Sequence, residues 1–107
     1  MTWKLFLDDE RRPNPADDFV VAASFNQAVK LVRRKGAPVF VDFDFNLGNG
    51  NEKNGLDFAR WLIKKDREGN GVFLPVDFAF NCHSASPDAN VKIERAMSEY
   101  LRSRRPA

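Results

Sequence analysis

The chain contains 107 residues, of which 43% are hydrophobic and 30% charged, and its formal net charge is +2. This length and hydrophobic content suit one domain with one core, so we expect a single domain over residues 1–107. The small net charge does not favour nucleic-acid binding through bulk electrostatics, and the sequence shows no signal peptide and no apolar run of about 18 residues, so we expect a cytoplasmic protein without membrane contact.

The first two predicted elements are short apolar strands at Trp3–Leu7 and Phe19–Ala22. The segment between them, residues 8–18, contains Pro13 and Pro15. Proline opposes helix formation because it lacks the amide donor and its ring clashes with the preceding turn. We therefore expect a loop where an α/β fold would normally place its first helix.

A helix and a third strand follow. Ser24, with Gln27 three residues later, forms a capping-box pattern at the start of an amphipathic helix, and Gly36 and Pro38 end that helix. The next apolar run, Val39–Phe43, predicts a strand. Strands and helices therefore alternate along the first half of the chain.

The second half continues this alternation. Glycines and asparagines predict a loop at Gly48–Asn54, where the glycines serve as turn formers because no lysine completes a phosphate-loop pattern. A helix is predicted at Leu56–Asp66 and a fourth strand at about Val76–Cys82. Ser86 can cap the last helix, with Pro87 at its first position.

The alternation predicts an α/β fold of the doubly wound class, in which a parallel sheet is covered on both faces and the crossovers are right-handed. The expected strand order is 2-1-3-4, without a fifth strand. We expect the basic tail Arg102–Ala107 to fray. In such sheets ligands bind beyond the carboxyl ends of the strands, where the strand order reverses.

Acidic side chains are crowded at that edge of the predicted sheet. Asp8, Asp9 and Glu10 directly follow the first strand in the stretch WKLFLDDERRP, and Asp44 ends the third strand, where Asp42 competes with it for the same role. These acids repel one another, and a divalent cation would relieve the repulsion, because magnesium takes oxygen ligands from carboxylates and substrate phosphates. We therefore predict a magnesium or manganese site, with a solvated turn as the alternative for the first three acids.

Further polar residues should reach the same crevice. His83 and Ser84 follow the fourth strand, and His83 could transfer protons near neutral pH, although a lone histidine often serves only in packing. Arg11 and Arg12 either balance the acids or bind a phosphate bidentately. Cys82, the only cysteine, lies in an apolar stretch and is better interpreted as a buried thiol than as a nucleophile.

The segments LFLDDE and NGLDFARWL, with an aspartate ending the third strand, resemble the receiver domains of two-component signalling. The resemblance implies magnesium ligands at Asp8 and Asp9, a phosphorylated aspartate at Asp44, and a strand-four hydroxyl at Ser84. Receiver domains also have a fifth strand with a lysine that contacts the phosphoryl group. We find no counterpart here and do not expect ordinary phosphorelay.

A closer resemblance is to the cyclic-phosphate processing receiver-like family. Its patterns DDxRxP, DxDLG, TGxD and HSxNP are similar to DDERRP, DFNLG, NGLD and HSASP in this chain. Phe45 and Asn46 stand where the family often has His and Asp, and Ser86 stands in place of an Asn. These departures could weaken metal or substrate binding.

This resemblance implies a metal-dependent phosphoesterase that opens a cyclic phosphate on a nucleotide or an RNA end. The alternative is a catalytically degenerate receiver that binds a protein partner or a phosphorylated ligand without turnover. For the enzyme, the implied roles are metal ligation by Asp8, Asp9 and Asp44, proton transfer by His83, and neutralisation of developing charge by Arg11, Arg12 and Ser84.

Overall fold

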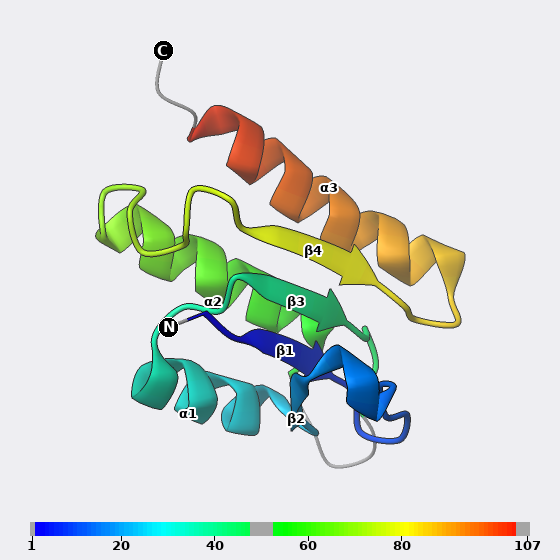
Figure 1. The fold of residues 1–107 in the computed structure, drawn as a ribbon. Coiled ribbons are helices and arrows are strands. Elements are labelled where there is room, and N and C mark those ends of the chain that lie inside the picture. Colours follow the sequence, from blue (N-terminus) through cyan, green and yellow to red (C-terminus); the bar gives the residue numbers. More distant parts are fainter. Residues whose placement is uncertain (1, 48–52, 105–107) are drawn as a thin grey trace.

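The computed structural model describes residues 2–47 and 53–104, which form a four-stranded sheet with three α-helices (Figure 1). Most of the loop predicted at Gly48–Asn54 lies outside the described residues. No helix within these ranges is long and apolar enough to cross a membrane. In chain order the elements are β1 (Lys4–Leu7), the 3-10 helix η1 (Pro15–Asp17), β2 (Phe19–Ala22), α1 (Phe25–Lys35), β3 (Phe40–Phe43), α2 (Gly55–Glu68), β4 (Ala79–Cys82) and α3 (Pro87–Ser103).

The sheet has the order β2-β1-β3-β4, and every neighbouring pair of strands is parallel. This confirms the predicted α/β class and the order 2-1-3-4, and the described part of the chain contributes no fifth strand. A loop with the short η1 helix joins β1 to β2, as Pro13 and Pro15 predicted. All four strands therefore end at the same edge of the sheet.

The three α-helices cover one face of the sheet. Leu5, Leu7 and Phe43 are fully buried on this face, in one core with side chains of α1, α2 and α3. Figure 1 shows α2 behind β3 and β4. The structure thus differs from a sheet covered on both faces. The reason is the loop between β1 and β2, which takes the place of the helix that would cover the second face.

The helix starts follow the predicted capping residues. The Ser24 hydroxyl accepts a hydrogen bond from the Gln27 amide at the start of α1. At α2, the side chain of Asn54 accepts from the Asp57 amide, and the Asp57 carboxylate accepts from the Asn54 amide. Ser86 caps α3 in the same way. These local contacts satisfy amides that have no partner inside the helix.

Several boundaries differ from the prediction by one to three residues, and the start of β4 and the end of α3 are the two that the buried Asp66 explains. β4 begins at Ala79 rather than Val76, because the preceding chain turns so that the Leu74 amide binds the carboxylate of Asp66. At the other end of the chain, α3 continues to Ser103, past the expected start of a frayed tail at Arg102.

Asp66, on α2, is fully buried and joins three segments of the chain. Its carboxylate accepts hydrogen bonds from the Leu74 amide at 2.7 Å and the Tyr100 hydroxyl at 2.5 Å, and it pairs with the Arg104 guanidinium at 3.3 Å. Arg104 also donates to the carbonyls of Leu74 and Pro75. Burial alone would raise the pKa of Asp66, but the hydrogen bonds from Tyr100 and Leu74 and the charge of Arg104 outweigh it and lower the pKa.

Candidate functional site

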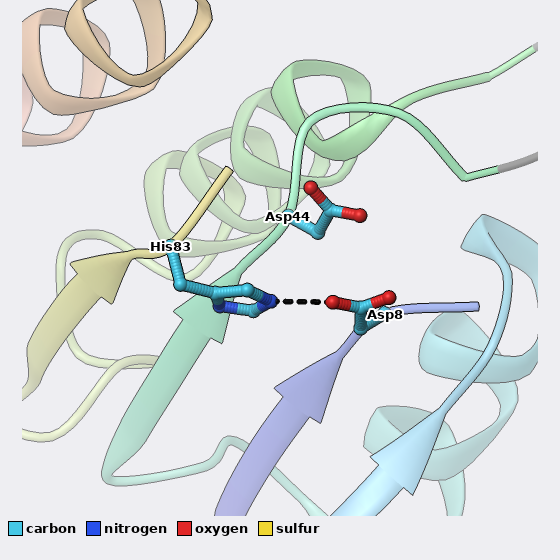
Figure 2. A group of neighbouring side chains, drawn as sticks. All are labelled: Asp8, Asp44 and His83. Atoms are coloured by element: carbon cyan, nitrogen blue, oxygen red, sulfur yellow. Dashed lines mark hydrogen bonds and ion pairs between the residues drawn. The ribbon is translucent and has the colours of Figure 1, made fainter. Parts of the chain in front are cut away.

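Three of the predicted polar residues meet beyond the carboxyl ends of β1, β3 and β4. Asp8 follows β1, Asp44 follows β3 and His83 follows β4, and one possible ligand atom from each lies within 4.8 Å of the others (Figure 2). The parallel order of the sheet brings them together, because strands adjacent in space end at the same edge. We call these three residues the acid–histidine group.

Asp8 is held by the turn that follows it. The side chain is 2% exposed, and its Oδ1 accepts hydrogen bonds from the amides of Glu10 at 2.8 Å and Arg11 at 3.0 Å. Burial alone would raise the pKa of Asp8, but these amides and His83 outweigh it and lower the pKa. The polar residues directly after β1 therefore form a turn whose backbone stabilises a buried carboxylate.

His83 lies between two carboxylates. Its Nε2 is 2.8 Å from Asp8 Oδ2, and its Nδ1 is 2.7 Å from Asp42 Oδ1. Burial alone would lower the pKa of His83, but the hydrogen bonds to Asp42 and Asp8 outweigh it and raise the pKa. The imidazole also stacks on the ring of Phe6, with centroids 4.6 Å apart. These contacts fix both the orientation of the ring and its tendency to carry a proton.

Asp42 is thus the partner of His83, and it is not part of the acid–histidine group. From the sequence, Asp42 competes with Asp44 for the role at the site. The two residues are two positions apart and therefore lie on one side of the strand. The sequence could not show that His83, at the end of β4, would bond to Asp42 on the neighbouring β3. Asn81 also donates to Asp42, at 3.2 Å.

Of the two carboxylates in the group, the negative charge of Asp44 is the less stabilised by its neighbours. Its Oδ1 accepts a hydrogen bond from the Phe45 amide at 2.9 Å. Burial raises the pKa of Asp44, the nearby negative charge of Asp8 raises it further, and the charges of His83 and Arg11 only partly oppose this. The repulsion between two carboxylates that a cation would relieve is therefore present in the structure.

Gly55 sets the backbone of Asp44 against the start of α2. Its amide donates to the Phe45 carbonyl at 2.8 Å, and a Cβ built on Gly55 would lie 1.9 Å from the Asp44 carbonyl oxygen. The sequence pattern alone indicates only a turn former at Gly55, directly after the glycine- and asparagine-rich loop. The structure shows that the position requires glycine because two backbone segments meet there.

Gly55→Ala should therefore destabilise the fold by about 1–3 kcal/mol or more, the usual cost of overpacking, and should displace Asp44. Urea denaturation measures the change in the free energy of unfolding. Gly69→Ala is the matched control, because a Cβ at Gly69 has no neighbour closer than 3.5 Å. Equal stabilities of the two variants would contradict the close approach at Gly55.

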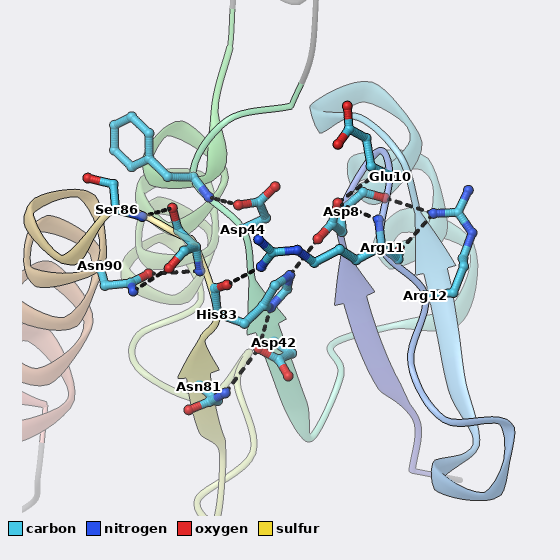
Figure 3. Close-up of polar contacts among 12 residues, drawn as sticks. Asp8, Glu10, Arg11, Arg12, Asp42, Asp44, Asn81, His83, Ser86 and Asn90 are labelled. Carbon is cyan, nitrogen blue, oxygen red and sulfur yellow. Dashed lines mark hydrogen bonds and ion pairs between the residues drawn. The ribbon is translucent and has the colours of Figure 1, made fainter.

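The other residues of the acidic turn lie at different distances from the group. Asp9 is half-buried, Glu10 is exposed, and neither belongs to the acid–histidine group. Arg11 reaches across to β4, where its Nη1 donates to the His83 carbonyl at 2.7 Å. Arg12 donates to the Arg11 carbonyl, and Figure 3 shows it on the far side of the turn from Asp44. Arg11 is thus the arginine next to the site.

Ser84 lies in a network at the start of α3. Its amide donates to the Asn90 side chain at 3.1 Å, Asn90 donates back to the Ser84 carbonyl, and the Ser84 hydroxyl accepts from the Ser86 amide. Asn90 had not been singled out in the sequence, because nothing local links it to Ser84. Cys82 is half-buried rather than fully buried, and its pKa, raised to about 12 mainly by burial, keeps the thiol protonated at neutral pH.

The carboxylate oxygens of the acid–histidine group are ligands that suit a divalent cation. With His83 bonded to Asp8 and Asp42, the ligands left for an ion are carboxylate oxygens of Asp8 and Asp44. One or two carboxylates, completed by water and phosphate oxygens, suit magnesium. The same oxygen ligands suit manganese, whereas coordination by an imidazole nitrogen would favour a metal such as zinc.

The parallel order 2-1-3-4, with acids after the first and third strands and a histidine after the fourth, defines a receiver-like α/β domain. The chain belongs to the family described as "Cyclic-phosphate processing Receiver domain", whose sequence description matches residues 3–99. Searches of curated proteins and of solved structures found no match. The family membership confirms the predicted resemblance.

Proposed function

We propose that this protein is a divalent-metal-dependent phosphoesterase that hydrolyses a cyclic phosphate on a nucleotide or an RNA end. The observation that carries the proposal is the acid–histidine group, with Asp42 as a second carboxylate on His83, in a member of a cyclic-phosphate processing family. A metal-phosphate site and a placed proton donor are the two components that this reaction needs.

Asp8 and Asp44 would hold the cation, which polarises a phosphate oxygen when bound. Asp9, which we predicted as a third ligand, could act only through a bound water or after a rearrangement of its turn. We propose magnesium or manganese as the cation, because both ions prefer oxygen ligands such as these carboxylates. The proposal requires that substrate oxygens complete the coordination, because Asp8 already accepts three hydrogen bonds in the structure.

His83 would carry the proton. In hydrolysis, the hydroxyl of one water joins phosphorus, one ring P–O bond breaks, and the proton of that water ends on the released ester oxygen. The product is a phosphomonoester with a free hydroxyl. Both ring nitrogens are bonded to carboxylates in the structure, so His83 would first have to release Asp8. Its imidazolium, still stabilised by Asp42, would then donate the Nε2 proton to the leaving oxygen and be reprotonated.

Arg11 and Ser84 would bind the phosphate. The guanidinium of Arg11 is exposed and bonded to the His83 carbonyl, which places it beside the group, and an arginine can bind two phosphate oxygens at once. The Ser84 hydroxyl can still donate, since it acts as an acceptor in its contact with the Ser86 amide. Arg12 would contribute only by reorienting from the Arg11 carbonyl.

A second candidate is a binding module that engages a protein partner or a phosphorylated ligand without turnover. The contact between His83 and Asp8 favours it, because this ion pair occupies a carboxylate oxygen that a metal would use. Turnover separates the two candidates. Both are compatible with the cytoplasmic location that we propose.

The test of the proposed function is a panel of 2′,3′- and 3′,5′-cyclic nucleotides and RNA with a cyclic phosphate end, each with magnesium or manganese. We expect release of a phosphomonoester from at least one of them. If none is hydrolysed while a phosphorylated ligand binds, the protein is the binding module.

A divalent cation should raise the melting temperature of the protein, because it binds only the native arrangement of Asp8 and Asp44. Metal at about a hundredfold excess over its Kd adds about 2.7 kcal/mol to the free energy of unfolding. Asp44→Asn should abolish this rise. It should leave the metal-free melting temperature equal or higher, since the repulsion with Asp8 is removed.

Differential scanning fluorimetry with magnesium, manganese and a chelator measures this effect. Asp77→Asn, which changes an exposed aspartate away from the group, is the control and should respond to metal like the parent. A parent protein that melts identically with chelator and with millimolar metal would show that no cation binds here.

A further inference from the structure

The face of the sheet opposite the three α-helices is continuous with the acid–histidine group. Lys4, Phe6 and Asp8 alternate along β1 with the buried Leu5 and Leu7, so they project from the face opposite the helices. By the same alternation and the strand register, Phe19 and Phe40 flank Lys4 on that face. The site and these aromatic side chains therefore share one side of the sheet.

The aromatic side chains on this side form an unbroken row. The ring of His83 stacks on Phe6, the Phe6 ring meets Phe19 edge-on with centroids 5.6 Å apart, and the Phe19 and Phe40 centroids are 5.9 Å apart. Phe6 is buried beneath its neighbours, whereas Phe19 and Phe40 are half-buried. The outer two rings thus have surface that a flat ligand group can contact.

Two cations lie along the row. The Lys4 ammonium lies 4.6 Å from the centre of the Phe19 ring, and Arg11 lies at the His83 end. Between Asp44 and Phe40 the strand runs for four residues, or about 13 Å at ~3.3 Å per residue. This distance exceeds the reach of one nucleotide from its phosphate to its base, and it suits a ligand of at least two nucleotides.

We propose that this row, which we call the ring row (Phe6, Phe19, Phe40 and Lys4), binds the unpaired bases of a single-stranded nucleic-acid end whose terminal phosphate lies at the acid–histidine group. The proposal rests on the proposed function and names the part of the substrate that the protein selects. Aromatic rings on an open sheet are a common platform for stacking bases, and Lys4 would neutralise a backbone phosphate.

The chemistry of the face favours nucleic acid over a protein partner. Among the described residues, the large hydrophobic side chains that are most exposed are Val72, Val76 and Val91, and none of them lies on this face. Apart from the half-buried Val21, which pairs with Phe6 in the register, the face presents ring surface and a cation. Such a combination matches bases joined by phosphates, since every base has a stacking surface and every linkage a negative charge.

The test is fluorescence anisotropy with a short single-stranded RNA that ends in a 3′-phosphate, labelled at its 5′ end, and with a matched RNA that lacks the last two bases. Magnesium and salt are held constant. We expect the parent to bind the complete RNA about tenfold or more tightly than the abasic one. Phe19→Leu combined with Phe40→Leu should remove this preference and retain the magnesium-dependent rise in melting temperature.

Trp61→Leu is the control, because Trp61 stacks on Phe58 among the helices on the covered side, and it should retain the base preference. Equal binding of both RNAs by the parent, or a preference that survives in the double leucine variant, would overturn the proposal. So would a dimer of the parent that the same variant abolishes, since the face would then join two copies. Failure to hydrolyse any cyclic phosphate would refute the proposed enzyme and leave this base preference measurable.

Discussion

Replacing His83 with alanine is expected to lower turnover of a cyclic phosphate by roughly 10²–10⁴-fold, the usual contribution of a placed proton donor. The reason is the position of the imidazole between Asp8 and Asp42, which stabilises its protonated form at the edge of the sheet. Steady-state kinetics on the best substrate of the panel measures the loss. kcat should fall more than KM rises, because the proton is needed in the transition state and not for binding.

Two further variants make this result specific. Asp42→Asn keeps the shape of the side chain and removes one of the two charges that stabilise the imidazolium, so its loss of turnover should be smaller than that of His83→Ala. The metal-dependent rise in melting temperature should persist in His83→Ala, since the carboxylates of Asp8 and Asp44 are the proposed ligands. Turnover that is undiminished in His83→Ala would remove this histidine from the mechanism.

Asp66→Ala is expected to cost about 3–5 kcal/mol of stability, a large share of the free energy of unfolding of a small domain. The substitution leaves the largely buried Arg104 without its counter-ion and the Leu74 amide and Tyr100 hydroxyl without their acceptor. Chemical denaturation measures the loss. Asp77→Ala, at an exposed aspartate, should be close to neutral.

The pH dependence of stability provides an independent measurement of the same network. Because the folded structure lowers the pKa of Asp66 below its ordinary value of 3.8, its contribution is fully present above that value and is lost as the pH falls through the lower folded pKa. Asp66→Asn, which cannot ionise, should lack this part of the acid destabilisation. If the parent and Asp66→Asn lose stability in parallel below pH 3.8, the carboxylate is not stabilised as the structure indicates.

The strands and helices could be predicted because the signals for them are local. Apolar runs of four residues, the capping residues Ser24 and Ser86, and the prolines after Asp8 each act on their immediate neighbours. The position of Asp8 and Asp44 at strand ends also follows from the local pattern. Once the strands are parallel, their carboxyl ends must share one edge, so the site could be placed on that edge in advance.

The contacts that make the site specific join residues far apart in the chain, and no local pattern encodes them. His83 meets Asp42 across 41 positions and Asp8 across 75, and Tyr100 meets Asp66 across 34. Gly55 is required only because α2 approaches the backbone of Asp44. Which partner a polar side chain takes depends on the direction it points and on what packs beside it, and both are set when the helices close over a single face of the sheet.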